Sequence, residues 1–315
     1  MGHRIQLERI RLAATRIQPV FLNSPVLCSD ELNEALGVEL ILKDETQNPI
    51  KCFKGRGSDF LAAEHSDGRP IVCASAGNFG QAMAYSGVRR GLTVTVYASE
   101  NASPLKLDRM RELGAHVVLH GEDFDAAKVE ARRVANDSKV RFVEDSKDIE
   151  TVEGAGTLGM EMLEYAGPYD ALLIALGNGA MFNGIAAVFK ELSPKVEMIA
   201  VQAQGAPAML DSWRAGKIIT HDSIATIADG IGVREPVPEA VEDMNPLIDD
   251  GILVSEESII EGMRLLKNKA GVVAEPSSAV GLAAILENRD RFAGRRVGAV
   301  LCGGNVSMEQ FREWL

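Results

Sequence analysis

The sequence predicts an α/β protein of two cooperating domains, each with a mostly parallel sheet flanked by helices. From about residue 37 onward, short apolar segments alternate with amphipathic ones, which is typical of βαβ units. The chain has 315 residues, too many for one small core and suitable for two domains of ordinary size. Apolar residues make up 46% and charged residues 25% of the chain, as in folded soluble proteins.

The predicted strands are the short apolar runs of this alternating pattern. They are Glu39–Leu42, Ile71–Ala74, Thr93–Tyr97, His116–Leu119, Arg141–Val143, Ala171–Leu176, Glu197–Val201 and Val297–Leu301. The predicted helices lie between these runs. They are Gln81–Arg90, Leu105–Leu113, Phe124–Asp137, Glu153–Tyr165, Met181–Leu192, Glu257–Lys269 and Ala279–Asn288. The proline-rich segment Val233–Pro246 is expected to be irregular, and a polar stretch marks a domain boundary near residues 145–150.

Composition narrows the class of protein. The formal net charge of −12 makes nucleic acid and anionic membrane surfaces unsuitable partners. The four cysteines form no C-x-x-C pair and the five histidines no ligand-spaced pair, so we expect neither a disulfide scaffold nor a metal site. There is no continuous apolar run of a signal peptide or a bilayer span. These features predict a soluble cytoplasmic protein.

Ligands of parallel sheets bind where strands end, so the loops after strands are the candidate sites. The first loop holds Lys54 between Phe53 and Gly55. Glycine lets the backbone approach a flat ligand, and a partly desolvated lysine suits Schiff-base chemistry. The alternative is an ordinary basic surface loop, which this segment alone does not exclude.

The second loop, Ser75-Ala76-Gly77-Asn78-Phe79, runs into a predicted helix. The N–H groups at such a helix start can bind a substrate carboxylate, and Asn78 adds a side-chain donor. The alternative is a capped turn in which Ser75 or Asn78 only satisfies the helix end.

The third loop, Gly177-Asn178-Gly179-Ala180-Met181, follows the apolar strand Ala171–Leu176. A glycine-rich turn before a helix offers unpaired N–H groups to a phosphate. The next glycine is Gly184, which does not fit a dinucleotide fingerprint, and no Walker lysine follows. We therefore expect a smaller phosphate-bearing cofactor here.

Cys302 follows the strand Val297–Leu301 and is the fourth candidate site residue at a strand end. The alternative is a buried structural thiol.

Taken in order, these elements resemble the fold-type II pyridoxal 5′-phosphate (PLP) enzymes, and most closely their serine/threonine dehydratase and serine racemase branch. The resemblance covers nearly the whole chain. Its motifs are Phe53–Gly57, Ser75–Gln81, Pro104-x-Lys106, Gly154–Thr157, Gly177–Met181, Asp229-Gly230, Glu275–Ala279 and Cys302–Asn305. The resemblance implies a tryptophan synthase β-like fold with a large PLP-binding domain, residues 1–52 and 149–315, and an inserted small domain, residues 53–148.

The resemblance also implies roles for individual residues. Lys54 would form the Schiff base with PLP, and Phe53 would pack beside the cofactor ring. Asn78 would bind the phenolic oxygen, and the Ser75–Phe79 loop would take the substrate carboxylate. The backbone amides of Gly177, Asn178, Gly179, Ala180 and Met181 would bind the phosphate. Cys302 would face the pyridine nitrogen as a neutral partner, which should favour prompt loss of a β-group.

The implied activity is β-elimination from a small amino acid such as serine, threonine or a β-substituted serine, giving a 2-keto acid and ammonia. The alternatives are β-replacement as in cysteine synthases, racemisation, and a non-catalytic PLP-binding role. Ala76 stands where racemases of this branch carry a second serine, so dehydration is preferred. Gln204 lies near the place of a metal-binding glutamate in relatives, so no metal is expected.

Two further expectations rest on the same resemblance. Phe79 replaces the usual histidine, which points either to a bulkier β-substituent or to packing alone. The few residues after Asn305 leave no room for the regulatory domain of feedback-inhibited threonine dehydratases. A homodimer is implied by the family and not by any particular segment.

Overall fold

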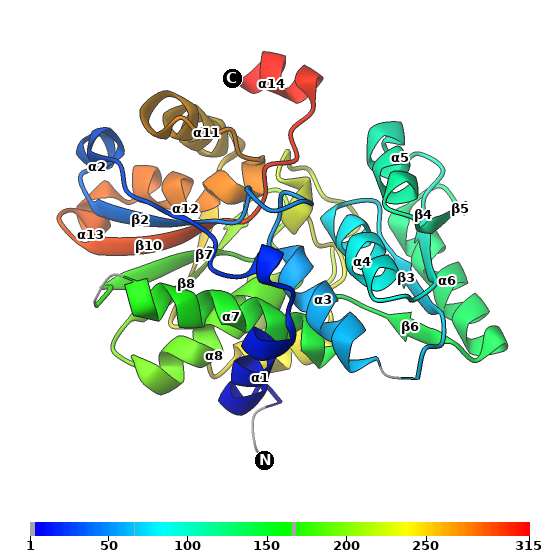
Figure 1. Ribbon diagram of the computed structural model, residues 1–315. Coiled ribbons are helices and arrows are strands. Elements are labelled where there is room, and N and C mark those ends of the chain that lie inside the picture. The colour runs from blue at the N-terminus through cyan, green and yellow to red at the C-terminus, as the bar shows by residue number, and fades with distance from the viewer. Residues whose placement is uncertain (1–3, 66, 166–167) are drawn as a thin grey trace.

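The computed structural model describes residues 4–65, 67–165 and 168–315. Two sheets lie side by side, each covered by helices on both faces (Figure 1). This arrangement confirms the predicted α/β class with parallel sheets. Among the described residues, no helix is long and apolar enough to cross a membrane.

The larger sheet has six strands. Their order is β1 (Val26–Leu27), β2 (Glu39–Asp44), β10 (Arg296–Leu301), β7 (Ala171–Ala175), β8 (Glu197–Ala203) and β9 (Asp250–Val254). Only the short β1 is antiparallel to its neighbour among these paired strands. All five residues of β7 are buried, because helices cover both faces of the sheet.

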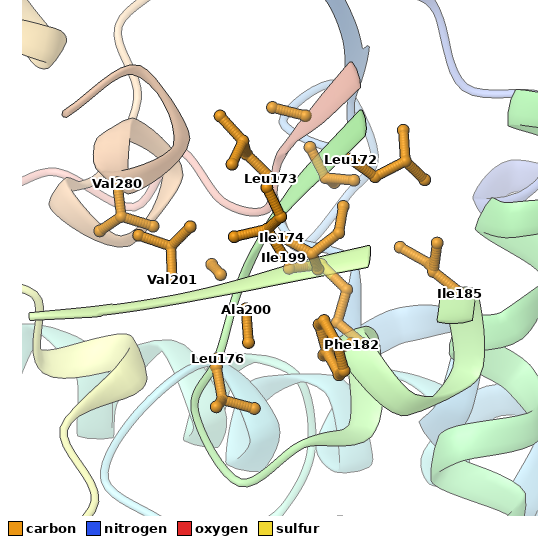
Figure 2. Close-up of a cluster of buried hydrophobic side chains, with 14 of the residues drawn as sticks. Leu172, Leu173, Ile174, Leu176, Phe182, Ile185, Ile199, Ala200, Val201 and Val280 are labelled. Carbon is orange, nitrogen blue, oxygen red and sulfur yellow. The ribbon is translucent and has the colours of Figure 1, made fainter. Parts of the chain in front are cut away.

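Helices from several parts of the chain cover the two faces of this sheet (Figure 1). One face carries α1 (Leu7–Arg16), α7 (Ile149–Tyr165) and α8 (Ala180–Leu192), and the other carries α2 (Asp30–Leu36), α11 (Glu256–Ala270), α12 (Pro276–Glu287) and α13 (Arg289–Phe292). Figure 2 shows β7 and β8 between Val280 of α12 on one side and Phe182 and Ile185 of α8 on the other. Shorter elements complete the part of the molecule that is built on this six-stranded sheet, which is the larger half. They are η1 (Pro19–Phe21), α9 (Ala208–Ala215), η2 (Asp229–Ile231), α10 (Pro238–Met244) and α14 (Met308–Trp314).

The smaller sheet has four parallel strands in the order β5 (His116–Leu119), β4 (Val94–Ala98), β3 (Ile71–Ala74) and β6 (Arg141–Val143). Helices α4 (Asn78–Arg89) and α5 (Pro104–Glu112) lie on one face, and α6 (Phe124–Ser138) lies on the other (Figure 1). The four-stranded sheet and its helices form the smaller half. Helix α3 (Lys54–Glu64) joins the two halves, because it packs against α4 of the smaller half and α7 of the larger half.

The structure contains all eight predicted strands and all seven predicted helices, with ends shifted by a few residues. The prediction that Val233–Pro246 is irregular was wrong in part, because α10 occupies Pro238–Met244 within it. Pro238 stands at the start of that helix, where its missing N–H group costs no hydrogen bond. The strands of the smaller sheet all fall within residues 53–148. The domain boundaries themselves stay a prediction, because α3 packs on both halves.

Candidate active site

A cavity of about 670 Å³ lies between the two sheets, at the carboxyl ends of their strands. Its lining includes every residue that the sequence predicted to bind the cofactor or the substrate. These are Phe53, Lys54, Ser75, Ala76, Gly77, Asn78, Phe79, Gly177, Asn178, Gly179, Ala180, Met181 and Cys302. A cavity of this size accommodates a small cofactor together with a small substrate.

Lys54 is the first residue of α3, whereas the sequence pattern suggested a loop. The flanking glycines let the helix pack closely: a Cβ on Gly55 would lie 2.2 Å from Cε1 of Phe21, and one on Gly57 would lie 2.4 Å from the carbonyl oxygen of Thr151. Tertiary packing therefore outweighs the low helix propensity of glycine. The Phe53 N–H donates to the carbonyl oxygen of Cys302 at 3.0 Å, which holds the start of α3 beside the end of β10.

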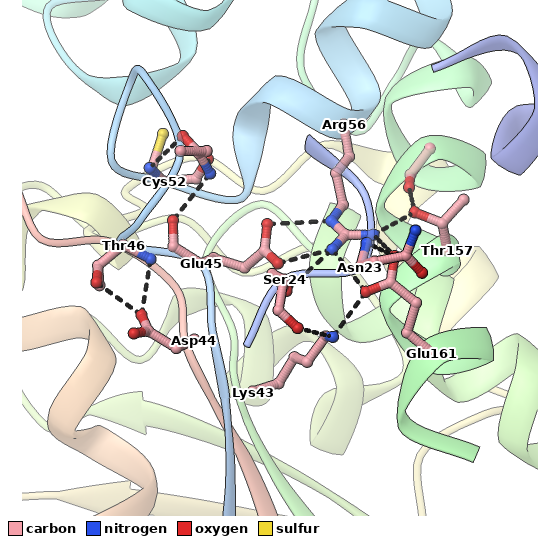
Figure 3. Close-up of polar contacts among 12 residues, drawn as sticks. Asn23, Ser24, Lys43, Asp44, Glu45, Thr46, Cys52, Arg56, Thr157 and Glu161 are labelled. Carbon is pink, nitrogen blue, oxygen red and sulfur yellow. Dashed lines mark hydrogen bonds and ion pairs between the residues drawn. The ribbon is translucent and has the colours of Figure 1, made fainter. Parts of the chain in front are cut away.

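A buried ion-pair network fixes α3 two residues beyond Lys54 (Figure 3). The Arg56 guanidinium is fully buried and lies 2.8 Å from Oε1 of Glu45 and 2.5 Å from Oε1 of Glu161. Lys43 lies 2.7 Å from Oε2 of the same Glu161, so two cations face two carboxylates. Since Glu45 follows β2 and Glu161 belongs to α7, Arg56 ties the Lys54 helix to the larger half.

The Lys54 amine has a carboxylate partner that sequence reasoning missed. Its Nζ lies 2.6 Å from Oδ2 of Asp145 and 4.7 Å from the centroid of the Phe53 ring. Asp145 stands two residues after β6, in the polar stretch interpreted only as a boundary. The rule that function lies after strand ends could have identified it.

The loop after β3 is held by its own serine. The Ser75 hydroxyl accepts hydrogen bonds from the N–H groups of Gly77 and Gly80 at 3.1 and 3.0 Å, so it satisfies the start of α4 as the capped-turn alternative predicted. Asn78 instead points toward other segments. Its Nδ2 donates to Glu275, and its Oδ1 accepts from Nδ2 of Asn305 at 2.8 Å.

The glycine-rich turn after β7 has the conformation expected of a phosphate cradle. Gly179 has a φ of +101°, which other residues rarely adopt, and α8 begins at the next residue. The Ala180 N–H, one of the predicted phosphate donors, donates to the Ser146 hydroxyl at 3.0 Å. Ser146 was not predicted. It is fully buried at the turn. Because its oxygen accepts from Ala180, its hydroxyl hydrogen is available to donate a hydrogen bond to an anion.

Burial raises the pKa of two further polar groups that line the cavity, Cys302 and Glu275. It raises the pKa of the Cys302 thiol to about 12, and the nearby Glu275 carboxyl adds to the shift. The thiol lies 3.5 Å from the Ser278 hydroxyl. Burial also raises the pKa of Glu275 to about 7, which the hydrogen bond from Asn78 opposes. Cys302 therefore lines the cavity as a thiol at neutral pH, and its role toward a cofactor stays a prediction.

Two ion pairs are formed between residues that line the cavity. Lys106 of α5 lies 2.5 Å from Oδ2 of Asp229, and Arg234 pairs with Asp125 of α6. Both join the smaller half to the segment that contains η2. In the described parts of the chain, no group of three or more His, Cys, Asp or Glu side chains is arranged to hold a metal ion.

Comparison with known proteins agrees with this geometry. Residues 17–303 match the model of the family described as pyridoxal-phosphate dependent enzyme. The chain is 33% identical to an L-threonine ammonia-lyase of Thermotoga maritima, over 96% of this chain and 76% of that protein. It is 28% identical to an L-threo-3-hydroxyaspartate ammonia-lyase of Saccharomyces cerevisiae, over 95% and 93%.

Solved structures show the same relationship. The structure of maize serine racemase superposes with a TM-score of 0.91 at 26% identity, covering 98% of this chain and 96% of that one. The resemblance to fold-type II PLP enzymes is thereby confirmed. The chain belongs to the family of pyridoxal-phosphate dependent enzymes.

Proposed function

We propose that this protein is a PLP-dependent ammonia-lyase that removes a β-leaving group from a small amino acid and forms a 2-keto acid and ammonia. The observation that carries the proposal is the placement of the Lys54 amine in one cavity with Asn78, the Gly177–Met181 turn and Cys302. The names of the relatives support it, since ammonia-lyases are similar to this chain over nearly its whole length.

The residues of the cavity fit PLP. Lys54 would attach the cofactor covalently, and Phe53 would pack beside it. The N–H groups from Gly177 to Met181, with the Ser146 hydroxyl, would hold the phosphate. Asn78 would bind the phenolic oxygen. Cys302 would face the pyridine nitrogen, and its raised pKa means that it offers a neutral thiol and no negative charge.

When bound, PLP supplies an electron sink for the pair released from Cα. The protein supplies the proton transfer and the positioning. The Lys54 amine would accept the Cα proton, a task that requires its neutral form. The N–H groups at the start of α4 would hold the substrate carboxylate and so fix Cα relative to Nζ of Lys54.

The cavity favours elimination over racemisation. A racemase requires a second acid–base group that delivers a proton from the other face of the substrate. Ala76 lines the cavity at the corresponding place in the loop and offers no ionisable group. β-Replacement is the remaining alternative. In that reaction a thiol takes the place of the β-leaving group, so the product is a new amino acid and not a keto acid.

The first experiment is to purify the protein, record its visible spectrum and assay keto acid and ammonia with a panel of β-substituted amino acids. A yellow protein that forms keto acid from at least one member is the expected result. The Lys54→Ala variant should lose this turnover. Keto acid formation at the normal rate by that variant, or failure of the wild type to bind PLP after reconstitution, contradicts the proposal. A new amino acid formed with added thiol indicates β-replacement.

We also propose a cytoplasmic homodimer, with the catalytic unit divided into a large domain, residues 1–52 and 149–315, and a small domain, residues 53–148. The family resemblance supports the dimer. Light scattering of the purified protein would give twice the chain mass of 33.9 kDa, and a monomer at micromolar concentration would contradict it.

A further inference from the structure

One carboxylate in the active-site cavity is not explained by elimination from a neutral amino acid. The Asp145 side chain is 10% exposed, and its Oδ2 lies 2.6 Å from Nζ of Lys54. Its Oδ1 is buried and has no hydrogen-bond partner within the described residues. A buried carboxylate without a full set of partners is costly, so this group requires a cation or a donor.

The other cations of the cavity already have carboxylate partners. Lys106 pairs with Asp229, Lys128 with Glu144, and Arg234 with Asp125. Lys54 is therefore the counter-ion of Asp145 in the protein alone. In the function proposed above, the Lys54 amine attaches the cofactor and then carries a proton, so it does not neutralise Asp145 throughout the reaction.

We infer that Asp145 binds a positively charged substituent on the β-carbon of the substrate, so that the preferred substrates carry a second, protonated amine there, as in 2,3-diaminopropionate. This inference rests on the proposed function and adds the substrate class to it. Asp145 also disfavours substrates with a β-carboxylate, because two carboxylates in a buried site repel each other. The chain thus differs from its yeast relative, whose name gives hydroxyaspartate as the substrate.

The chemistry balances for such a substrate. The proton of Cα goes to the Lys54 amine, and the electrons of that C–H bond form the Cα–Cβ double bond. The electrons of the Cβ–N bond leave with nitrogen, so the protonated amine departs as ammonia. The released 2-aminoacrylate reacts with water to give pyruvate and a second ammonia. Asp145 assists by keeping the β-amine protonated until it leaves.

The test compares three holoenzymes: wild type, Asp145→Asn, and Asp137→Asn as the matched control. Asp137 is an exposed aspartate whose Oδ2 also lies 2.6 Å from a cation, Nη1 of Arg133, on the outer face of α6. Calorimetry measures the binding of three ligands that have no β-leaving group: L-2,4-diaminobutyrate, L-alanine and L-aspartate. Keto acid formation is then measured with 2,3-diaminopropionate and with serine.

Wild type and Asp137→Asn should bind diaminobutyrate about tenfold or more tightly than alanine, the range of one charged hydrogen bond. Both should bind aspartate more weakly than alanine. In Asp145→Asn, the affinity ratio of diaminobutyrate to alanine and that of alanine to aspartate should both fall toward one. The preference for diaminopropionate over serine in keto acid formation should fall as well. If Asp145 only positions Lys54, the three ligands change affinity together and the ratios stay constant, which overturns the inference.

The design separates this inference from the proposed function. Keto acid from serine together with constant binding ratios leaves the lyase and rejects the role of Asp145. Ratios that depend on Asp145, without keto acid from any substrate, keep the binding site and reject the lyase. If Asp145→Asn does not fold, Asp145→Ser replaces it. The wild-type comparison of diaminobutyrate with aspartate needs no variant, and tighter binding of aspartate overturns the inference by itself.

Discussion

Both carboxylate oxygens of Glu275 accept hydrogen bonds from Nδ2 of Asn78, at 3.0 and 3.1 Å. Glu275 immediately precedes α12 of the larger half, whereas Asn78 begins α4 of the smaller half. The contact therefore joins the two halves within the lining of the cavity. Because burial raises the pKa of Glu275 to about 7, this connection changes protonation near neutral pH.

We expect Glu275→Gln to change how stability depends on pH. A carboxyl whose pKa is higher in the folded than in the unfolded state stabilises the fold fully below about pH 4.5, and this contribution is lost as pH rises through about 7. Glutamine keeps the shape and does not titrate. Relative to the variant, the wild type should lose up to about 3 kcal/mol of unfolding free energy over this range. Urea unfolding of the cofactor-free proteins at pH 5 and pH 8 measures the difference. An equal difference at both values would contradict the assignment.

Arg56 should be among the most sensitive positions for stability. Replacing it with alanine leaves the fully buried Glu45 without a cation and Glu161 with Lys43 alone, which we expect to cost about 3–5 kcal/mol. Arg56→Lys keeps the charge but not the bidentate contacts of the guanidinium, so its loss of unfolding free energy should be smaller than that of Arg56→Ala. Thermal unfolding gives the order, with Arg133→Ala as a control on an exposed pair. A fall in melting temperature no larger than that of the control would show that the network is not needed.

How much the sequence predicts differs between elements for physical reasons. The buried strands are predicted well, because helices on both faces require continuous apolar runs such as β7. Helix α3 is missed, because its glycines lower helix propensity and their packing partners lie far away in the chain. The partner of Lys54 is missed for a related reason: Asp145 lies 91 residues away, and no local pattern links the two. Motif order locates the cavity, but only the fold shows which charges meet inside it.

Gly179 offers a test of the phosphate turn. Alanine at this position meets a φ of +101° and a Cβ that would lie 3.0 Å from Nδ2 of Asn183. We expect Gly179→Ala to weaken PLP binding at least several-fold, since a strained turn no longer directs its N–H groups to the phosphate. Gly37→Ala is the control, with a φ of +72° and no atom within 4 Å of the added Cβ. Titration of both apoproteins with PLP, followed by absorbance, measures the affinity. Equal affinities for the two variants would reject the role of the turn.

The four cysteines should differ sharply in reactivity. Burial raises the pKa of Cys73 and of Cys302 to about 12 and holds that of Cys52 well above its ordinary value, so all three stay thiols at pH 8. Cys28 is exposed. Since the thiolate is the reactive form, iodoacetamide should label Cys28 first and leave the other three unmodified in the native protein. Mass spectrometry of peptides after timed labelling reads this out, with a sample in denaturant as the reference for full labelling. Labelling of Cys302 as fast as Cys28 would mean that the cavity thiol is ionised, and the neutral partner assigned to the pyridine nitrogen would then be wrong.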